Sequence, residues 1–483
     1  MKIYITNYDK TLEAESGTNL LAVLREAGYG PDAPCGGKGT CGKCKVLLDG
    51  AEVLSCQVAV TRDMQVTLFE EKKAEILTGG LTVDVKADGT DRYVLAFDLG
   101  TTTVVSYLLD GTTGRELAKT SCVNPQTRYG ADVISRIQYA MDESAEAISA
   151  CIRSALAELT VKAASLAGID SKEITTVCIV GNTAMHHLLL NIDPKPLTQP
   201  PYMPSVSHAL ELPADFLPVA ETATRRILPN IAGFVGADTV GCLVSTRFDQ
   251  LEDVTLMIDI GTNGEMVLGN KDGFLACSTA AGPAFEGAKI SCGMRGAEGA
   301  VDHVWLEKGT LCHSVIGGGE SVGLCGSGLL DLVSVLLKTE DIDEFGRMEE
   351  SPYVLSEKVS LTQKDVREVQ LAKAAIRAGI ELMCKKRGIT PADIRKVYLA
   401  GAFGNYMDPA SACAIGLIPP VLEDRIEPIG NAAGEGAKLC ALSQEAFAYS
   451  RRLAEQAEFL ELASMREFND CYVDCMLFEE EEE

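Results

Sequence analysis

Residues 1–70 alternate short apolar runs with polar ones. The runs KIYIT and TLEAE have the period of two that is typical of strands. An apolar stripe with helical spacing follows, and Thr18 or Asn19 can cap the first turn of that helix. The stripe consists of Leu20, Leu21, Val23 and Leu24. A cysteine loop and further strand-like runs, including KVLLDGAEVLSC, complete the pattern. We therefore predict a small domain of strands around one helix.

Residues 71–92 differ from the segments on either side of them. They are charged, contain a pair of glycines and show no sustained hydrophobic period. A flexible segment of about 20 residues has a mean span of roughly 25 Å. We predict a linker that lets the small domain move relative to the rest of the chain.

From residue 93 onward, strand-like runs alternate with helical ones, and one unit occurs twice. The first copy is VLAFDLGTTTVVSYLLD (94–110), and the second is VTLMIDIGTNGEMVLGN (254–270). In each copy an apolar run leads to an acid, a glycine follows two residues later, and a second strand-like run begins. This pattern predicts strand, tight turn and strand in two related α/β halves of one domain, residues 93–483, which face each other across a cleft.

Length and composition agree with several folded domains. A chain of 483 residues is too long for one compact core and predicts roughly two to four domains. Its apolar share of 46% and charged share of 23% are those of a globular protein. The formal charge of −26 repels phosphate backbones and anionic lipids, which argues against nucleic acid or membrane partners.

The cysteine content points to metal rather than to disulfides. The N-terminus MKIYITNYDK has no apolar signal region, and no run of about 18 apolar residues occurs, so we expect a cytoplasmic protein. In that reducing compartment, seventeen cysteines are not expected to form a disulfide framework. Clustered cysteines should therefore bind metal.

Four cysteines lie close together in the predicted small domain. Their spacing is C-x5-C-x2-C-x11-C, with small residues between the first three, and they are Cys35, Cys41, Cys44 and Cys56. Glycines let a loop wrap closely around the sulfides and donate N–H groups to sulfur. We predict a [2Fe-2S] cluster. The alternatives are a zinc site, which usually has paired short spacings on both sides, and unrelated structural cysteines.

The repeated unit predicts a phosphate site. Asp98 and Asp259 end apolar strands just before Gly-Thr turns, where a carboxylate can hold Mg²⁺ through waters. The turn N–H groups and hydroxyls can then cradle phosphates. The turn residues concerned are Gly100, Thr101, Thr102, Gly261, Thr262 and Asn263.

Two further glycine pairs could bring the backbone close to a flat base or a phosphate. Gly326 and Gly328 lie just before a predicted helix in GLCGSGLLDLV, and Gly401 and Gly404 follow a strand in KVYLAGAFGNYMDP. Each pair could also be no more than a helix cap. The segment STAAGPAFEGAKISCGMRG contains Gly282, Glu286 and Arg295, to which spacing assigns no role.

These motifs resemble a known superfamily and, within it, a narrower family. DLGTTT, DIGTNGE and LAGAFG, in this order, are similar to the two phosphate motifs and the adenosine motif of actin-like ATPases, which include sugar kinases. NPQTRYGADVISRI, VGNTAMHHLLL, PNIAGFVGADTVG, AGPAFEGA, CGSGLLDL, TQKDVREVQLAKAAI and GNAAGEGA resemble the reductive activators of corrinoid proteins, as does the cysteine spacing.

The resemblance implies a fold and an activity. The fold would be α/β and multidomain, with a β-grasp ferredoxin-like domain before a duplicated ribonuclease H-like ATPase domain of the actin and sugar-kinase type. The activity would be the ATP-dependent return of Co(II) to Co(I) in the corrinoid protein of a methyltransferase system, with electrons from a low-potential donor. The implied ligands are Asp98, Gly100, Thr101, Asp259, Gly261 and Thr262 for phosphate and Mg²⁺, with Gly401 and Gly404 for adenosine.

The chain departs from the longer activators in one respect. They carry an extra domain, associated with dimerisation, before the first phosphate motif, whereas Asp98 here follows the linker almost directly. Without that domain the sequence does not decide the oligomeric state, and a homodimer is one alternative.

Two other functions would also use a cluster and a nucleotide cleft. A small-molecule kinase fused to a ferredoxin needs a carboxylate base, for which Asp238 in GADTVG is a candidate. The alternatives for Asp238 are a helix cap and a role linked to Mg²⁺. A redox sensor would use the nucleotide domain to change partners. His186, His187, Cys471 and Cys475 are assigned no role, because packing in the core accounts for such residues more often than ligation does.

Overall fold

The structure is a computed structural model of the chain. It describes residues 1–27, 29–31, 37, 39, 44–69, 87–88, 92–130 and 132–478, without the side chain of Ala402. Most of the predicted linker lies outside these residues. Within them, no helix combines the length and the apolar character needed to cross a bilayer.

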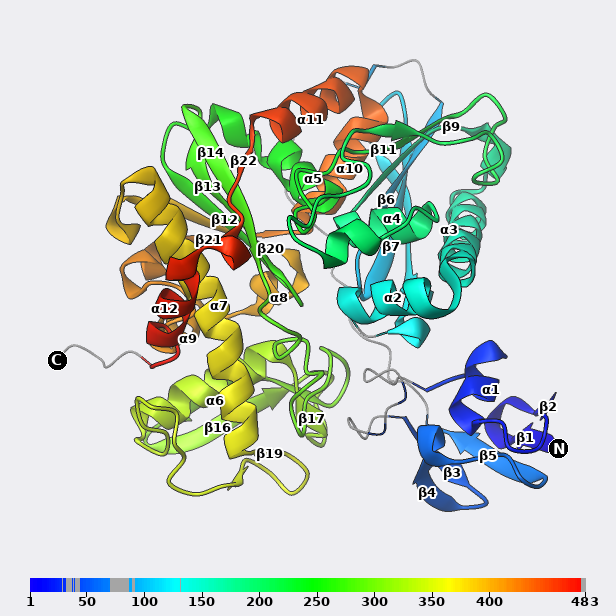
Figure 1. Ribbon diagram of the computed structural model, residues 1–483, viewed down its shortest axis with the longest axis horizontal. Coiled ribbons are helices and arrows are strands. Elements are labelled where there is room, and N and C mark those ends of the chain that lie inside the picture. Colours follow the sequence, from blue (N-terminus) through cyan, green and yellow to red (C-terminus); the bar gives the residue numbers. More distant parts are fainter. Residues whose placement is uncertain are drawn as a thin grey trace.

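In its described residues, the N-terminal domain is a five-stranded sheet with one α-helix (Figure 1). Its strands are β1 (Lys2–Ile5), β2 (Lys10–Glu13), β3 (Lys45–Leu48), β4 (Ala51–Leu54) and β5 (Met64–Leu68), in the order β2-β1-β5-β3-β4. The helix α1 (Leu20–Glu26) buries its predicted apolar stripe and is capped by Asn19, which accepts from Ala22 N. β1 and β5 are parallel and the other pairs antiparallel. This is the expected β-grasp arrangement.

The first half of the large domain is built on a six-stranded sheet. Its strands are β6 (Tyr93–Leu99), β7 (Thr103–Asp110), β8 (Glu116–Val123), β9 (Ile174–Gly181), β10 (Leu210–Glu211) and β11 (Thr224–Ile227), in the order β10-β11-β9-β6-β7-β8. The helices are α2 (Val133–Tyr139), α3 (Ala145–Ala167), α4 (Thr183–Leu189) and α5 (Ala237–Thr246). β6 to β8 form antiparallel pairs, whereas β9 is parallel to both β6 and β11.

The second half repeats this topology. Its strands are β12 (Thr255–Ile260), β13 (Gly264–Asn270), β14 (Gly273–Thr279), β20 (Lys396–Ala400), β21 (Ile426–Gly430) and β22 (Glu458–Phe459), in the order β21-β20-β12-β13-β14-β22. The helices are α7 (Gln363–Arg387), α8 (Gly401–Tyr406), α9 (Pro409–Ala414), α10 (Ala432–Leu442), α11 (Gln444–Gln456) and α12 (Arg466–Asp474). The runs β8-β7-β6-β9-β11 and β14-β13-β12-β20-β21 correspond strand for strand, which confirms the predicted pair of related halves.

A smaller layer is inserted into the second half between β14 and α7. It contains β15 (Ala300–Glu307), β16 (Thr310–Val315), β17 (Gly323–Leu324), the helix α6 (Gly326–Lys338) and the short pair β18 (Tyr353–Val354) and β19 (Ser360–Leu361). α6 begins at Gly326, so Gly326 and Gly328 lie in its first turn rather than before it. The predicted position of these glycines was therefore slightly wrong.

The two halves share a central core in which α5 and α10 pack against each other (Figure 1). Buried residues of both sheets contribute to it, including Tyr107 and Met257. The helices approach closely at two glycines: a Cβ atom at Gly436 would lie 2.0 Å from Gly241 O. Because this contact is close-packed, a change in the angle between the halves must be accommodated at α5 and α10.

Candidate functional site

A cleft of about 390 Å³ is lined by both repeated turns and therefore lies between the halves. In the β6–β7 turn, Gly100 N donates to Thr103 O at 3.0 Å; in the β12–β13 turn, Gly261 N donates to Asn263 O at 3.0 Å. The corresponding glycines thus close the two turns in similar ways. The residues predicted for phosphate in these turns all line the cleft: Gly100, Thr101, Thr102, Gly261, Thr262 and Asn263.

The two strand-end aspartates are held by different neighbours. Asn431 donates from Nδ2 to Asp98 Oδ2 at 2.7 Å. Asp259 lies against Gly401, where a Cβ atom would be 2.5 Å from Asp259 Oδ1. Gly401 also has a φ of +81°, a conformation that L side chains rarely adopt. Gly401, predicted as part of the adenosine motif, is therefore needed to leave room for the carboxylate of Asp259.

Four partly buried carboxyl groups lie together in the cleft, and their partial removal from water raises their pKa values. Burial raises the pKa of Asp98 to about 6. Burial, followed by the charges of Asp98 and Glu286, raises the pKa of Asp259 to about 6. The pKa values of Asp238 and Glu265 are also raised, mainly by burial and further by neighbouring acids. A hard divalent cation prefers oxygen ligands and would relieve this repulsion, so these residues fit Mg²⁺.

Glu286 connects the two phosphate turns. Thr102 Oγ1 donates to Glu286 Oε2 at 3.0 Å, and Thr262 Oγ1 donates to Glu286 Oε1 at 2.6 Å. A third turn hydroxyl, that of Thr101, accepts from Asn182 Nδ2 at 2.9 Å. The sequence pattern gave Glu286 no role, because nothing local to AGPAFEGA indicates which turns it reaches.

Two aromatic side chains also line the cleft. The rings of Phe285 and Phe403 stack with centroids 5.0 Å apart and an angle of 15° between their planes. A Cβ atom at Gly326 would lie 2.8 Å from the Phe403 ring, so a glycine is needed where α6 begins. Flat apolar walls beside side-chain-free backbone fit a nucleobase.

Gly326 and Gly401 line the cleft, whereas Gly328 and Gly404 are absent from its described lining. A Cβ atom at Gly328 would lie 2.2 Å from Val301 O, and one at Gly404 would lie 3.0 Å from the Leu399 Cβ. Both glycines therefore permit close packing of a helix on a strand. Their part in nucleotide binding stays a prediction.

Several residues that line the cleft were not predicted from the sequence, including Asn182, Glu265, Phe285, Phe403 and Asn431. The two asparagines carry a signal that could have been recognised. Each ends an apolar strand and caps the helix that follows, with its side-chain oxygen accepting from Met185 N or Gly434 N. Glu265 is opposite Asp259 in the β12–β13 register, but its place in the cleft depends on the packing of the second half as a whole.

Of the four predicted cluster ligands, Cys35 and Cys41 lie outside the described residues. Cys44 is buried just before β3, and Cys56 lies in the short 3-10 helix Ser55–Gln57. Both pack with Leu21, and Asn19 Nδ2 donates to Cys56 O at 2.8 Å. Gly37 and Gly39, between the first and second ligands, have φ values of +86° and +75°. Two thiols on an apolar base beside left-handed glycines fit a cluster loop.

The residues that were assigned no role lie elsewhere. His186 Nδ1 lies 2.6 Å from Asn230 Nδ2, and burial lowers the pKa of His186 to about 4. His187 Nε2 accepts from Ser205 N at 3.0 Å. Both rings are thus packed inside the first half. Cys471 and Cys475 place their sulfur atoms 4.0 Å apart at α12.

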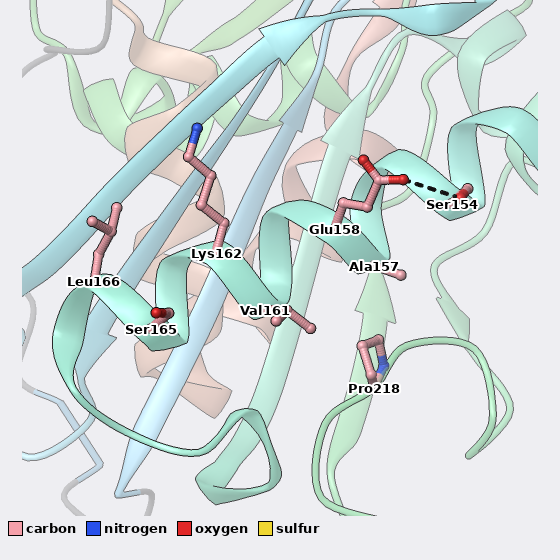
Figure 2. Close-up of a pocket in the computed structure, with 8 residues that line it drawn as sticks. All are labelled: Ser154, Ala157, Glu158, Val161, Lys162, Ser165, Leu166 and Pro218. Carbon is pink, nitrogen blue, oxygen red and sulfur yellow. Dashed lines mark hydrogen bonds between the residues drawn. The ribbon is translucent and has the colours of Figure 1, made fainter. Parts of the chain in front are cut away.

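A second hollow lies on the outer face of α3 (Figure 2). Figure 2 shows Val161, Lys162 and Leu166 along this helix, with Pro218 on a neighbouring loop. Ser154 Oγ donates to Glu158 Oε1 at 3.4 Å. None of the predicted site residues lines it. It offers neither glycine turns nor an acid cluster, so it does not resemble the nucleotide cleft.

Comparison with known families matches nearly the whole chain. The 2Fe-2S iron-sulfur cluster binding domain matches residues 3–67. The RACo middle region matches residues 93–251, and the C-terminal domain of RACo, the ASKHA domain, matches residues 253–483.

Individual related proteins agree with these family matches. The chain is 38% identical to "Corrinoid activation enzyme RamQ" of Eubacterium limosum over 79% of its own length and 69% of that protein. It is 27% identical to "[Co(II) methylated amine-specific corrinoid protein] reductase" of Methanosarcina barkeri over 79% of this chain and 76% of that one. The solved structure of "Reductive activator for corrinoid,iron-sulfur protein" has 28% identity, a TM-score of 0.73, and coverage of 99% of this chain and 98% of that one.

Duplicated topology, facing turns and the N-terminal sheet define an iron-sulfur ATPase of the actin and sugar-kinase type. This class contains proteins with very different substrates, so the fold alone does not select one. The chain belongs to the reductive activators of corrinoid proteins.

Proposed function

We propose that this protein uses ATP to pass an electron from a [2Fe-2S] cluster to Co(II) of a corrinoid protein, which regenerates Co(I) in a methyltransferase system. The observation that carries the proposal is the joining of two units in one chain: a 2Fe-2S domain and a cleft built from two facing phosphate turns. The names of the relatives, an activation enzyme and a Co(II) reductase, support the same reaction. We place the reaction in the cytoplasm.

The chain would hold its cofactors in separate domains. Cys35, Cys41, Cys44 and Cys56 would bind the cluster, which supplies one-electron chemistry when bound. Asp98 and Asp259 would hold Mg²⁺ through waters, and the bound ion would neutralise phosphate charge. The turns at Thr101 and Thr262 would cradle the phosphates, while Gly401 and the stacked rings would receive the adenosine.

ATP can assist electron transfer only if it binds two conformations unequally. Moving one charge against an unfavourable 100 mV costs about 2.3 kcal/mol, so a weak donor leaves little Co(I) without another source of work. The phosphate turns lie on different halves, and Glu286 already bonds to both. Nucleotide in this cleft would therefore favour one angle between the halves. This change of angle would alter the complex with the corrinoid protein. A low-potential donor would reload the cluster.

The test uses cluster-loaded protein that has been reduced chemically. With Mg-ATP it should restore the Co(I) spectrum of a corrinoid protein from a methyltransferase system. Without nucleotide, or with Asp259→Asn, the Co(II) spectrum should persist. Glu298→Gln is a suitable control, because Glu298 is exposed and is not among the described lining of the cleft. Equal reduction without nucleotide would rule out an ATP-driven activator.

The same preparations separate the alternatives. A kinase would consume ATP only with a sugar or another acceptor, with Asp238 as the base. A redox sensor would bind nucleotide without reducing cobalt. Mass measurement in solution decides between a monomer and a homodimer.

A further inference from the structure

Glu286 is held rigidly at the cleft by a tight turn. Glu286 N donates to Pro283 O at 3.2 Å, and Gly287 N donates to Ala284 O at 3.0 Å. Gly287 has a φ of +75°, and a Cβ atom there would lie 2.6 Å from Met294 N. Since Phe285 is buried and stacked on Phe403, the neighbours on both sides fix where Glu286 points.

The carboxylate of Glu286 has unused capacity. Each of its oxygens accepts one threonine hydroxyl, and a carboxylate oxygen has two lone pairs. Glu286 lines the cleft, and the second turn comes close to Oε1 without crowding it, since a Cβ atom at Gly261 would lie at ordinary contact distance, 3.7 Å. A water molecule bound to Glu286 would therefore lie between the two phosphate turns.

The aspartates of the site are placed differently. Asp98 and Asp259 belong to the strands that enter the turns, and Asp238 Oδ1 accepts from Thr239 N of its own helix. Glu286 alone among the six acids that line the described cleft is bonded to hydroxyls of both turns; the others are Asp98, Asp238, Asp259, Glu265 and Asp302. A terminal phosphate that replaced Glu286 as the acceptor of these two hydroxyls would lie beside this carboxylate.

We propose that Glu286 orients the water that attacks the terminal phosphate of ATP and accepts its proton. The water oxygen forms a bond to the γ-phosphorus, and the bond from that phosphorus to the β–γ bridging oxygen breaks. ADP leaves with the bridging oxygen, phosphate is formed, and the proton passes to Glu286 and then to solvent. This inference rests on the proposed function, for which it names the residue that performs hydrolysis.

The same contacts couple hydrolysis to the angle between the halves. Thr102 belongs to the first half, whereas Glu286 and Thr262 belong to the second. The carboxylate can engage both turns only while the halves are as close as they are here. Opening the cleft would separate Glu286 from the first turn and stop hydrolysis without moving the acid itself.

The experiment compares Glu286→Gln with the unaltered, cluster-loaded protein. Glutamine keeps the shape and can still accept from a threonine, but it is a very poor proton acceptor. We expect steady-state ATP hydrolysis to fall roughly 100-fold or more, while the affinity for a fluorescent ATP analogue changes less than about threefold. Glu286→Ala should be similarly slow and should be partly rescued by added formate, which can replace the missing carboxylate. Glu298→Gln is the matched control and should hydrolyse ATP normally.

Three outcomes would overturn the inference. They are hydrolysis by Glu286→Gln within threefold of normal, loss of analogue binding together with hydrolysis, and absence of formate rescue in a Glu286→Ala protein that binds the analogue. Failure of the unaltered protein to hydrolyse ATP would have a different meaning. It would overturn the proposed ATP-driven function itself.

Discussion

Asn431 joins the two halves at the nucleotide cleft by donating a hydrogen bond of 2.7 Å to Asp98. The same amide nitrogen lies 3.1 Å from the Tyr107 hydroxyl, and its oxygen accepts from Gly434 N at the start of α10. One side chain therefore caps a helix of the second half and supports an acid of the first. Its loss should affect stability and nucleotide binding together.

Asn431→Ala tests this double role. Loss of the cap costs about 1 kcal/mol, and the missing donor to a partly buried carboxylate adds about 1–3 kcal/mol. We expect urea denaturation to show a loss of about 2–4 kcal/mol in the free energy of unfolding, and ATP hydrolysis to fall at least tenfold. Ser144→Ala removes the cap of α3, where Ser144 Oγ accepts from Ala147 N, and should lower stability alone. If both variants hydrolyse ATP at the same rate, Asn431 has no role in the nucleotide site beyond stability.

Acidification should stabilise the metal-free and nucleotide-free protein. The pKa of Asp98 is about 6 in the folded protein and 3.8 without its surroundings, so the folded state binds more protons between these values. Its contribution to stability is therefore present at low pH and is lost as the pH rises through 6. Asp259, with a pKa of about 6, behaves in the same way.

We expect each of these two carboxyls to add about 1 kcal/mol to the free energy of unfolding between pH 7 and pH 5. Denaturation curves at a series of pH values measure this gain. Asp98→Asn should remove its own share, and saturating Mg-ATP should reduce the effect in the unaltered protein. If the unaltered protein and Asp98→Asn respond equally to pH, Asp98 is not the group that titrates.

Gly401→Ala should damage the site through Asp259. The added Cβ would lie 2.5 Å from Asp259 Oδ1, and the φ of +81° would be strained. We expect ATP hydrolysis to fall at least tenfold. Gly388→Ala is the matched control, since Gly388 is also left-handed at a φ of +69° but has nothing within 4 Å of an added Cβ. That control should cost about 1–2 kcal/mol of stability and leave hydrolysis intact.

The four predicted cluster cysteines can be tested by chemical analysis. Protein purified without oxygen should be brown and contain about two irons and two acid-labile sulfides per chain. Cys41→Ser and Cys44→Ser should each lose most of both, whereas Cys475→Ser at the end of α12 should retain them. One zinc per chain without sulfide would contradict the [2Fe-2S] prediction.

Local features of the sequence are enough to identify the two kinds of site. The strand pairs around Asp98 and Asp259 follow from short-range alternation, tight turns and glycine, all of which act within a few residues. The helix of the small domain follows from its apolar stripe and its Asn19 cap for the same reason. The family's motifs then imply the activity.

Tertiary structure alone decided how these sites are completed. Glu286 reaches Thr102, and Asn431 reaches Asp98, only after two sheets and the crossing of α5 and α10 have set the distance between the halves. Gly328 and Gly404 are equivalent to Gly326 and Gly401 in sequence, yet they pack closely on Val301 and Leu399 and are absent from the described lining of the cleft. The physical reason is that hydrogen bonds and close contacts between distant segments depend on the packing of the whole core, which a local pattern does not specify.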